Sequence, residues 1–271
     1  MPSRFRVHDL HIHTHFSSDS VEELKAYAEA GEQLAIHVGY LDHFELAFQD
    51  REGYLTEERL PELLEEFSEV HSRYPNTSLS LEVDYYSHLS SEVGEFCDNH
   101  CHDFDYLIGT VHNVDGLAVT SRREMALLVQ KFGLIEVLRR YFDEIEAAIR
   151  SKLFDGIAHI DAAMRYAPNF SEASQKTEDY WRTRTLELGK ISRQYNLPVE
   201  VNLTGLNYPW GRTHPDQELI DLLAESGTKF FVGSDSHRMK LFVQSVPLVR
   251  QMTKYLQEKG ALMLPGNLVS L

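Results

Sequence analysis

Residues 8–19 read HDLHIHTHFSSD and follow a short alternating run from Phe5 to Val7. The run predicts a strand that ends within this stretch. Because every second side chain of a strand points the same way, His11 and His13 would direct two imidazoles toward one point. This is metal-ligand spacing, although a single His-x-His pair is a weak signal that also occurs among hydrogen-bonded core histidines.

The composition indicates a globular protein, since 42% of its 271 residues are hydrophobic and 25% are charged. This length suits one α/β barrel, so we expect a single domain over residues 1–271.

Acidic residues outnumber basic ones by 42 to 26, and the formal charge of −16 disfavours long nucleic acid and anionic membranes as partners. The first residues lack the apolar core of a signal peptide, and no run approaches the roughly 20 apolar residues of a membrane span. We therefore expect a cytoplasmic location.

Six further apolar runs predict strands, and helical stretches alternate with them. Alternation of this kind predicts a parallel sheet, and seven such units favour a closed or nearly closed barrel over an open sheet. No glycine-rich loop follows the first strand, which disfavours a nucleotide-binding Rossmann domain. The six runs are 35–41, 79–83, 106–111, 157–160, 199–203 and 230–232.

Two helices have limits that the sequence suggests. Ser20 and Glu23 form a capping-box pattern, and Gly31 is expected to close the helix that follows. Apolar residues at helical spacing predict one long helix from Phe132 to Ile149.

Six of the seven expected strands carry His, Asp or Glu at or near their carboxyl ends, which converge on one rim of a parallel barrel. Several buried imidazoles and carboxylates in one cavity would be unstable without cations. Imidazole and carboxylate ligands without thiolates suit Zn, Mn or Fe, and their number implies two or three ions that share a bridging carboxylate. The residues are His11, His13, His43, Glu82, His112, His159, Asp235 and His237.

These motifs resemble those of the PHP (polymerase and histidinol phosphatase) family, and within it the stand-alone histidinol-phosphatases, over nearly the whole chain. The likeness rests on D-L-H-I-H at residues 9–13, Asp19 six residues later, D-H at 42–43, the strand glutamate Glu82, G-x-V-H at 109–112, H-I-D at 159–161 and S-D-x-H at 234–237.

The resemblance implies a distorted seven-stranded (β/α)7 TIM-like barrel that holds three metal ions. It also implies that Asp9 orients an imidazole from outside the ligand set. The implied ligands are His11, His13, Glu82 and Asp235 for one ion, Glu82, His112 and His159 for a second, and Asp19, His43 and His237 for the third.

Such a cluster suits phosphoester hydrolysis, because paired cations lower the pKa of a bridging water and hold phosphoryl oxygens. Arginines at the same rim would bind the remaining oxygens in a fork geometry. Arg165 and Arg212 are similar in placement to the family's phosphate-contacting arginines, Arg238 is a third candidate, and Asn202 bonds either the substrate or a neighbouring backbone group. We expect catalytic roles for His237, Asp235, Arg165 and Arg212, and substrate contacts from Arg165, Arg212, Arg238 and Asn202.

Family likeness favours a phosphomonoesterase that hydrolyses L-histidinol phosphate in histidine biosynthesis. The alternative is a nucleotide or nucleoside-bisphosphate phosphatase, or an exonuclease, of the same family. An amidohydrolase shares the His-x-His strand and the barrel, but no strand end here carries its bridging lysine. A non-catalytic metal-binding protein is disfavoured by the complete ligand set.

Other metal-like residues carry less weight. The segment Cys97–His102 contains two cysteines and two histidines, but their spacing is not that of a standard zinc site, and we interpret it as a solvated helix turn. His214 precedes Pro215 near a helix start and is expected at the surface.

Overall fold

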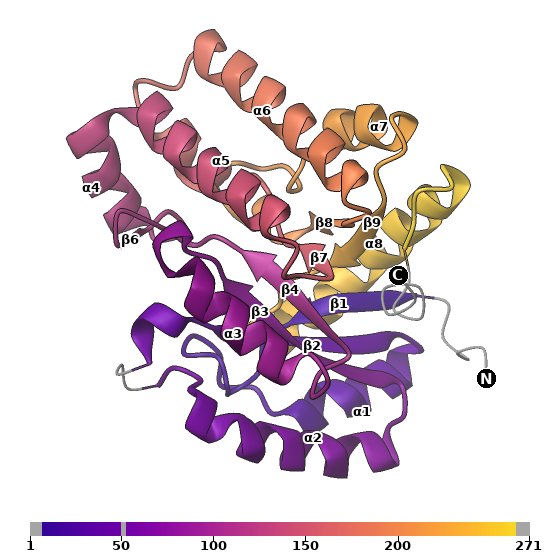
Figure 1. Cartoon of the computed structure of the whole chain (residues 1–271). Helices are drawn as coiled ribbons and strands as arrows, with labels where there is room; N and C mark the ends of the chain where they lie inside the picture. Colours follow the sequence, from indigo (N-terminus) through magenta and orange to yellow (C-terminus); the bar gives the residue numbers. More distant parts are fainter. Residues whose placement is uncertain (1–6, 50–52, 264–271) are drawn as a thin grey trace.

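Seven parallel strands form one sheet in the order β1-β2-β3-β4-β7-β8-β9 (Figure 1). The computed structural model describes residues 7–49 and 53–263, so Phe5 and Arg6 of the first expected strand lie outside the described residues. A parallel bridge between Ile12 and Ser236 brings β9 beside β1. The sheet therefore closes on itself, which confirms the expected seven-stranded α/β barrel. The strands are β1 (His8–Ile12), β2 (His37–Phe44), β3 (Thr77–Asp84), β4 (Tyr106–Thr110), β7 (Gly156–Ile157), β8 (Val199–Asn202) and β9 (Phe230–Gly233).

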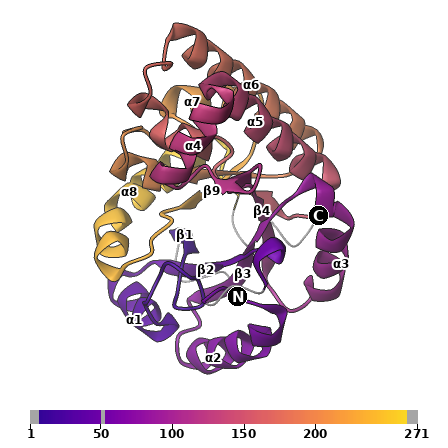
Figure 2. The ribbon, with the colours of Figure 1, turned by 90° about the vertical axis from the view of Figure 1, so that its left-hand side faces the viewer.

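Helices surround the strands, as Figure 2 shows. Among the helices that the structure describes, none is long and apolar enough to cross a membrane. The cytoplasmic location expected from the sequence stays a prediction. The α-helices are α1 (Leu24–Leu34), α2 (Leu60–Arg73), α3 (Ser90–His100), α4 (Arg122–Phe132), α5 (Leu134–Ser151), α6 (Gln175–Gln194), α7 (Gln217–Glu225) and α8 (Met239–Glu258). Short 3-10 helices are η1 (Leu46–Phe48), η2 (Glu57–Arg59), η3 (Ser87–Leu89), η4 (Ala162–Asn169) and η5 (Thr204–Asn207).

Alternation along the strands separates two environments. Leu79, Leu81 and Val83 of β3 belong to the main hydrophobic core, whereas Glu82 between them faces the barrel interior. Part of that interior is filled by a second apolar cluster, so the barrel is not a pore and the polar side chains occupy the carboxyl ends of the strands. The second cluster consists of Leu10, Leu41, Tyr106, Ile108, Ala158 and Phe231.

Beyond β4 the chain forms a small hairpin of β5 (Asn113–Val114) and β6 (Leu117–Ala118) before entering α4. The Ser121 hydroxyl accepts a hydrogen bond from the Glu124 backbone N–H and caps α4, while the Glu124 carboxylate accepts from the N–H of Ala118 at 2.7 Å. These contacts tie the hairpin to the helix.

The limits expected for the first helix are wrong, whereas the second expected helix is confirmed. α1 begins only at Leu24, because the Ser20 hydroxyl donates instead to the carbonyl oxygens of His13 and His237, at 3.1 and 3.0 Å, and the helix continues past Gly31 to Leu34. The expected long helix from Phe132 to Ile149 is α5, Leu134–Ser151, which begins two residues later because Gly133, with a φ of 81°, separates it from α4. Contacts of Ser20 with His13 and His237 thus override the capping-box pattern.

Candidate metal centre

Glu82 lies at the centre of a group of imidazoles at the carboxyl ends of the strands. Its Oε1 is 2.9 Å from Nε2 of His159 and 3.5 Å from Nε2 of His112. Its Oε2 is 2.9 Å from Nδ1 of His43 and 3.4 Å from Nε2 of His11. Both oxygens are buried without an aligned hydrogen-bond donor among the described residues. Glu82 belongs to two of the possible ligand sets of this cluster and would be shared between them.

A contact with Glu200, which lies outside this group of imidazoles, determines which ring nitrogen of His11 carries a proton. Its Nδ1 lies 2.7 Å from Oε1 of Glu200, and both side chains are fully buried. A carboxylate only accepts hydrogen bonds, so Nδ1 carries the proton and Nε2 of the neutral ring keeps its lone pair. That Nε2 lies 2.9 Å from Nε2 of His13.

His13 is held in the same way by a hydroxyl group. Its Nδ1 lies 3.1 Å from the Ser17 hydroxyl, which itself donates to Oδ1 of Asp42 at 2.7 Å. The Ser17 oxygen therefore accepts from His13, which leaves the lone pair of a neutral His13 on Nε2. The backbone N–H and the hydroxyl of Thr14 both donate to Asp42 and fix this support.

Two imidazole lone pairs 2.9 Å apart require a positive charge between them. In the protein alone a proton supplies it: burial opposes a charged ring, but Glu200, Glu82 and Asp235 outweigh burial and hold the pKa of His11 well above its usual value. A divalent cation would supply the same charge, and imidazole with carboxylate donors suits one. The residues therefore fit a metal centre.

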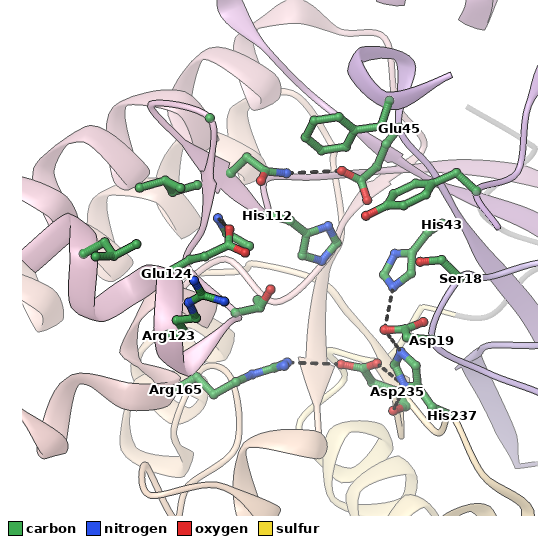
Figure 3. Close-up of a pocket in the computed structure, with 18 residues that line it drawn as sticks. Ser18, Asp19, His43, Glu45, His112, Arg123, Glu124, Arg165, Asp235 and His237 are labelled. Carbon is green, nitrogen blue, oxygen red and sulfur yellow. Dashed lines mark hydrogen bonds and ion pairs between the residues drawn. The ribbon is translucent and has the colours of Figure 1, made fainter. Parts of the chain in front are cut away.

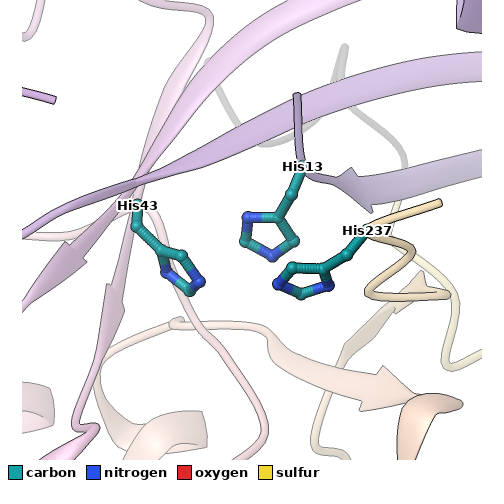
Figure 4. A group of neighbouring side chains, drawn as sticks. All are labelled: His13, His43 and His237. Carbon is teal, nitrogen blue, oxygen red and sulfur yellow. The ribbon is translucent and has the colours of Figure 1, made fainter. Parts of the chain in front are cut away.

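The possible ligand atoms form four overlapping sets, each within 4.8 Å. Figure 4 shows one of them, in which His43 of β2 meets His13 and His237, which follow β1 and β9. Asp19 adds a carboxylate to this set, since its Oδ2 lies 3.1 Å from Nε2 of His237. All nine expected ligands thus come together, and their division among ions stays a prediction. The other sets are His11, His13 and Asp235, then His11, Glu82 and His159, then His43, Glu82 and His112.

The chain is similar to several known proteins. The PHP domain family matches residues 9–204. The chain belongs to the PHP family. The histidinol-phosphatase of Lactococcus lactis subsp. lactis is 24% identical over 252 residues, which cover 91% of this chain and 90% of the relative. A Deinococcus radiodurans protein named "Probable histidinol-phosphatase" is 25% identical over 239 residues, covering 85% and 86%.

Solved structures share the PHP barrel of this chain. One from Listeria monocytogenes aligns with a TM-score of 0.79 at 18% identity, covering 86% of this chain and 96% of that one. Histidinol phosphate phosphatase from Lactococcus lactis, crystallised with zinc, L-histidinol and phosphate, aligns with a TM-score of 0.74 at 20% identity, covering 92% and 94%. These alignments establish the common fold.

A pocket of about 480 Å³ is lined by several of the expected ligands, among them His43, His112 and His237 (Figure 3). Arg165 lines it, with Nη2 3.5 Å from Oδ2 of Asp235 and its guanidinium 4.4 Å from the centre of the Tyr208 ring. Arg123 of α4 lines the same pocket. The sequence contains no signal for Arg123, because its helix reaches the pocket only through the tertiary fold.

The two other expected arginines lie elsewhere. Arg212 forms ion pairs with Glu178 and Asp216 at 2.9 and 3.2 Å, and it lines a different pocket between α6 and the loop before α7. Arg238 is exposed at the start of α8 and does not line the pocket beside the cluster. Of the three arginines expected at the phosphate, the structure brings only Arg165 to the cluster.

Asn202 and Glu200 form hydrogen bonds to each other and to residues expected as metal ligands. The Asn202 amide donates to Oδ2 of Asp235 at 3.2 Å and to Oε2 of Glu200 at 3.1 Å, so it positions carboxylates. Glu200 also accepts from the backbone N–H of His159 at 3.0 Å. Glu200 is not among the residues expected from the sequence, although it lies between two valines of β8 as Glu82 lies between two apolar residues of β3.

Two expectations near the cluster are wrong. Asp9 does not bond an imidazole, because its Oδ1 accepts from the backbone N–H of Ser234 at 2.8 Å and so holds the loop before Asp235. His214 is fully buried rather than at the surface, with Nδ1 2.9 Å from Oδ1 of Asp161. In the segment Cys97–His102, none of the residues joins the four ligand sets found among the described residues.

Proposed function

We propose that this protein is a metal-dependent phosphomonoesterase of small phosphate esters and that its substrate is L-histidinol phosphate. The observation that carries the proposal is the position of Glu82, buried among imidazoles at or just beyond the carboxyl ends of four strands, beside a pocket that contains Arg165. The relatives named histidinol-phosphatase support the choice of substrate, as does the Lactococcus lactis structure with zinc, L-histidinol and phosphate.

Two or three divalent ions, Zn, Mn or Fe, are part of the proposal. The nine residues expected from the sequence would hold them, with Glu82 shared. When bound, such ions lower the pKa of water toward about 7 and neutralise charge on a phosphoryl group.

Arg165 would bind the phosphoryl oxygens. Its guanidinium is planar and can donate two parallel hydrogen bonds, and its side chain is already largely buried between Asp235 and Tyr208. Little side-chain entropy is then lost when phosphate binds. Asp235 contacts both His13, at 3.2 Å, and Arg165, so it sets the guanidinium relative to the cluster. His237 lines the same pocket and keeps its proposed catalytic role.

The test is phosphate release by the purified protein loaded with Mn or Zn. L-Histidinol phosphate should give the highest kcat/KM in a panel that includes a nucleoside bisphosphate and a short oligonucleotide. Chelator treatment and His11→Ala should each abolish turnover. Full activity after metal removal would refute the mechanism, and a preference for the nucleotide would favour the alternative within the family.

A further inference from the structure

One carboxylate in the pocket has no role in the proposed hydrolysis. Glu45 directly follows β2, is 9% exposed and lines the pocket. In Figure 3 it lies on one side of His43 and His112, and Arg165 lies on the other. The pocket therefore has a guanidinium at one end and a carboxylate at the other, with the metal-ligand residues between them.

Two neutral donors fix one oxygen of Glu45. Its Oε2 accepts from the Tyr86 hydroxyl at 3.3 Å and from the Asn113 amide at 3.2 Å. The nearby imidazoles of His43 and His112 pair with Glu82 instead, and among the described residues no lysine, arginine or histidine forms an ion pair with Glu45. A largely buried carboxylate of this kind gains from a cationic or N–H donor supplied by a ligand.

Aromatic side chains also line this pocket. Phe48 and Tyr54 both line it, with their ring centres 5.7 Å apart in an edge-to-face arrangement. Aromatic faces beside a carboxylate suit an ammonium group or a nitrogen heterocycle better than a sugar or a simple alkyl alcohol.

We infer that Glu45 selects the leaving group of the ester, by accepting a hydrogen bond on Oε1 from a protonated nitrogen of the alcohol portion. The inference rests on the proposed function and deepens it. The phosphate end of the substrate meets Arg165 and the cluster, and the nitrogen-bearing end meets Glu45. The substrate class is thus phosphate monoesters of amino or imidazolyl alcohols, and the neutral alcohol esters bind less well.

Glu45→Gln is the decisive variant, because it removes the charge and keeps an oxygen that accepts from Tyr86 and Asn113. Four esters are compared: L-histidinol phosphate, phosphoethanolamine with only the ammonium, 2-(imidazol-4-yl)ethyl phosphate with only the imidazole, and 2-phenylethyl phosphate with neither. We expect kcat/KM to fall by about tenfold or more, mainly through KM, for esters whose nitrogen meets Glu45. The value for 2-phenylethyl phosphate should stay within about twofold. Whichever single-nitrogen ester loses more identifies the nitrogen.

Glu92→Gln, at an exposed position of α3, is the matched control and should change none of the four values. Metal content and Tm are measured for every variant. An equal loss on all four esters, or no loss on any, would overturn the inference.

Glu45→Asp keeps the charge and should retain the preference for nitrogen-bearing esters over 2-phenylethyl phosphate even if all rates fall. Loss of that preference in Asp and Gln variants alike would also overturn it. Failure of the proposed function appears differently, as a wild-type protein that leaves L-histidinol phosphate intact while it hydrolyses other esters.

Discussion

Nδ1 of His11 and Oε1 of Glu200 lie 2.7 Å apart, although 189 residues separate them in the chain. The contact joins β1 to β8 inside the barrel and fixes both the tautomer and the orientation of the His11 ring. Asp84 acts in the same way on His112, with Oδ2 3.2 Å from its Nδ1. His11 and His112 are therefore each oriented by a carboxylate at the ring nitrogen that faces away from Glu82.

Glu200→Gln should weaken metal binding by about 10- to 100-fold. A neutral amide is a poorer acceptor for His11, and its NH2 group would face the donors of Asn202 and His159. Chelator competition with metal analysis measures the change. Glu225→Gln, at an exposed position of α7, is the control. An unchanged metal affinity in Glu200→Gln would show that the His11 ring does not need the Glu200 carboxylate to bind metal.

Gly233→Ala should destabilise the protein by about 1–3 kcal/mol and lower its metal affinity. A Cβ at this position of β9 would lie 2.0 Å from Oε1 of Glu200 and 2.4 Å from Cβ of His11. Gly94→Ala is the control, since its Cβ would meet only Leu153 at 3.6 Å and the change favours α3 by about 0.5–1 kcal/mol. Urea unfolding measures both variants. If Gly233→Ala has the same free energy of unfolding as the wild-type protein, β9 moves to make room for the new Cβ without a loss of stability.

Arg165→Ala should lower kcat/KM by about 100-fold, because it removes the guanidinium nearest the cluster. Arg212→Ala should cost far less, since Arg212 pairs with Glu178 outside this pocket. Steady-state kinetics on L-histidinol phosphate compare the two. A larger loss for Arg212→Ala than for Arg165→Ala would instead support the phosphate contact expected for Arg212 from the sequence.

His37 should make the fold acid-sensitive. Burial, together with neighbouring His8 and His71, lowers the pKa of His37 to about 3. In the unfolded chain His37 has a pKa of about 6.5, so it binds a proton at pH values at which the folded protein does not. The free energy of unfolding therefore falls as the pH falls between these two pKa values. The loss from this residue is about 2 kcal/mol between pH 7 and pH 5. Urea unfolding of chelator-treated protein at both pH values should show a smaller loss for His37→Gln, and equal losses would contradict the assignment.

The sequence by itself determined the barrel and the cluster. Strand alternation and the position of a residue at a strand's carboxyl end are local properties, and parallel strands bring those ends together whatever the loops do. His11, Glu82 and Asp235 could be placed at one rim for this reason. The same alternation indicates Glu200 as a further carboxylate of this cluster, since it lies between two valines.

Only the tertiary structure decided which residues border the pocket and which orient the ligands. Arg123 and Glu45 reach the pocket from a helix and a loop whose paths depend on packing. Arg212 lies outside this pocket, in a loop where it forms an ion pair with Glu178 of α6. Ser20, which the local pattern assigns to a helix cap, bonds His237 from the other end of the chain. Such contacts join residues far apart in sequence, and no local period encodes them.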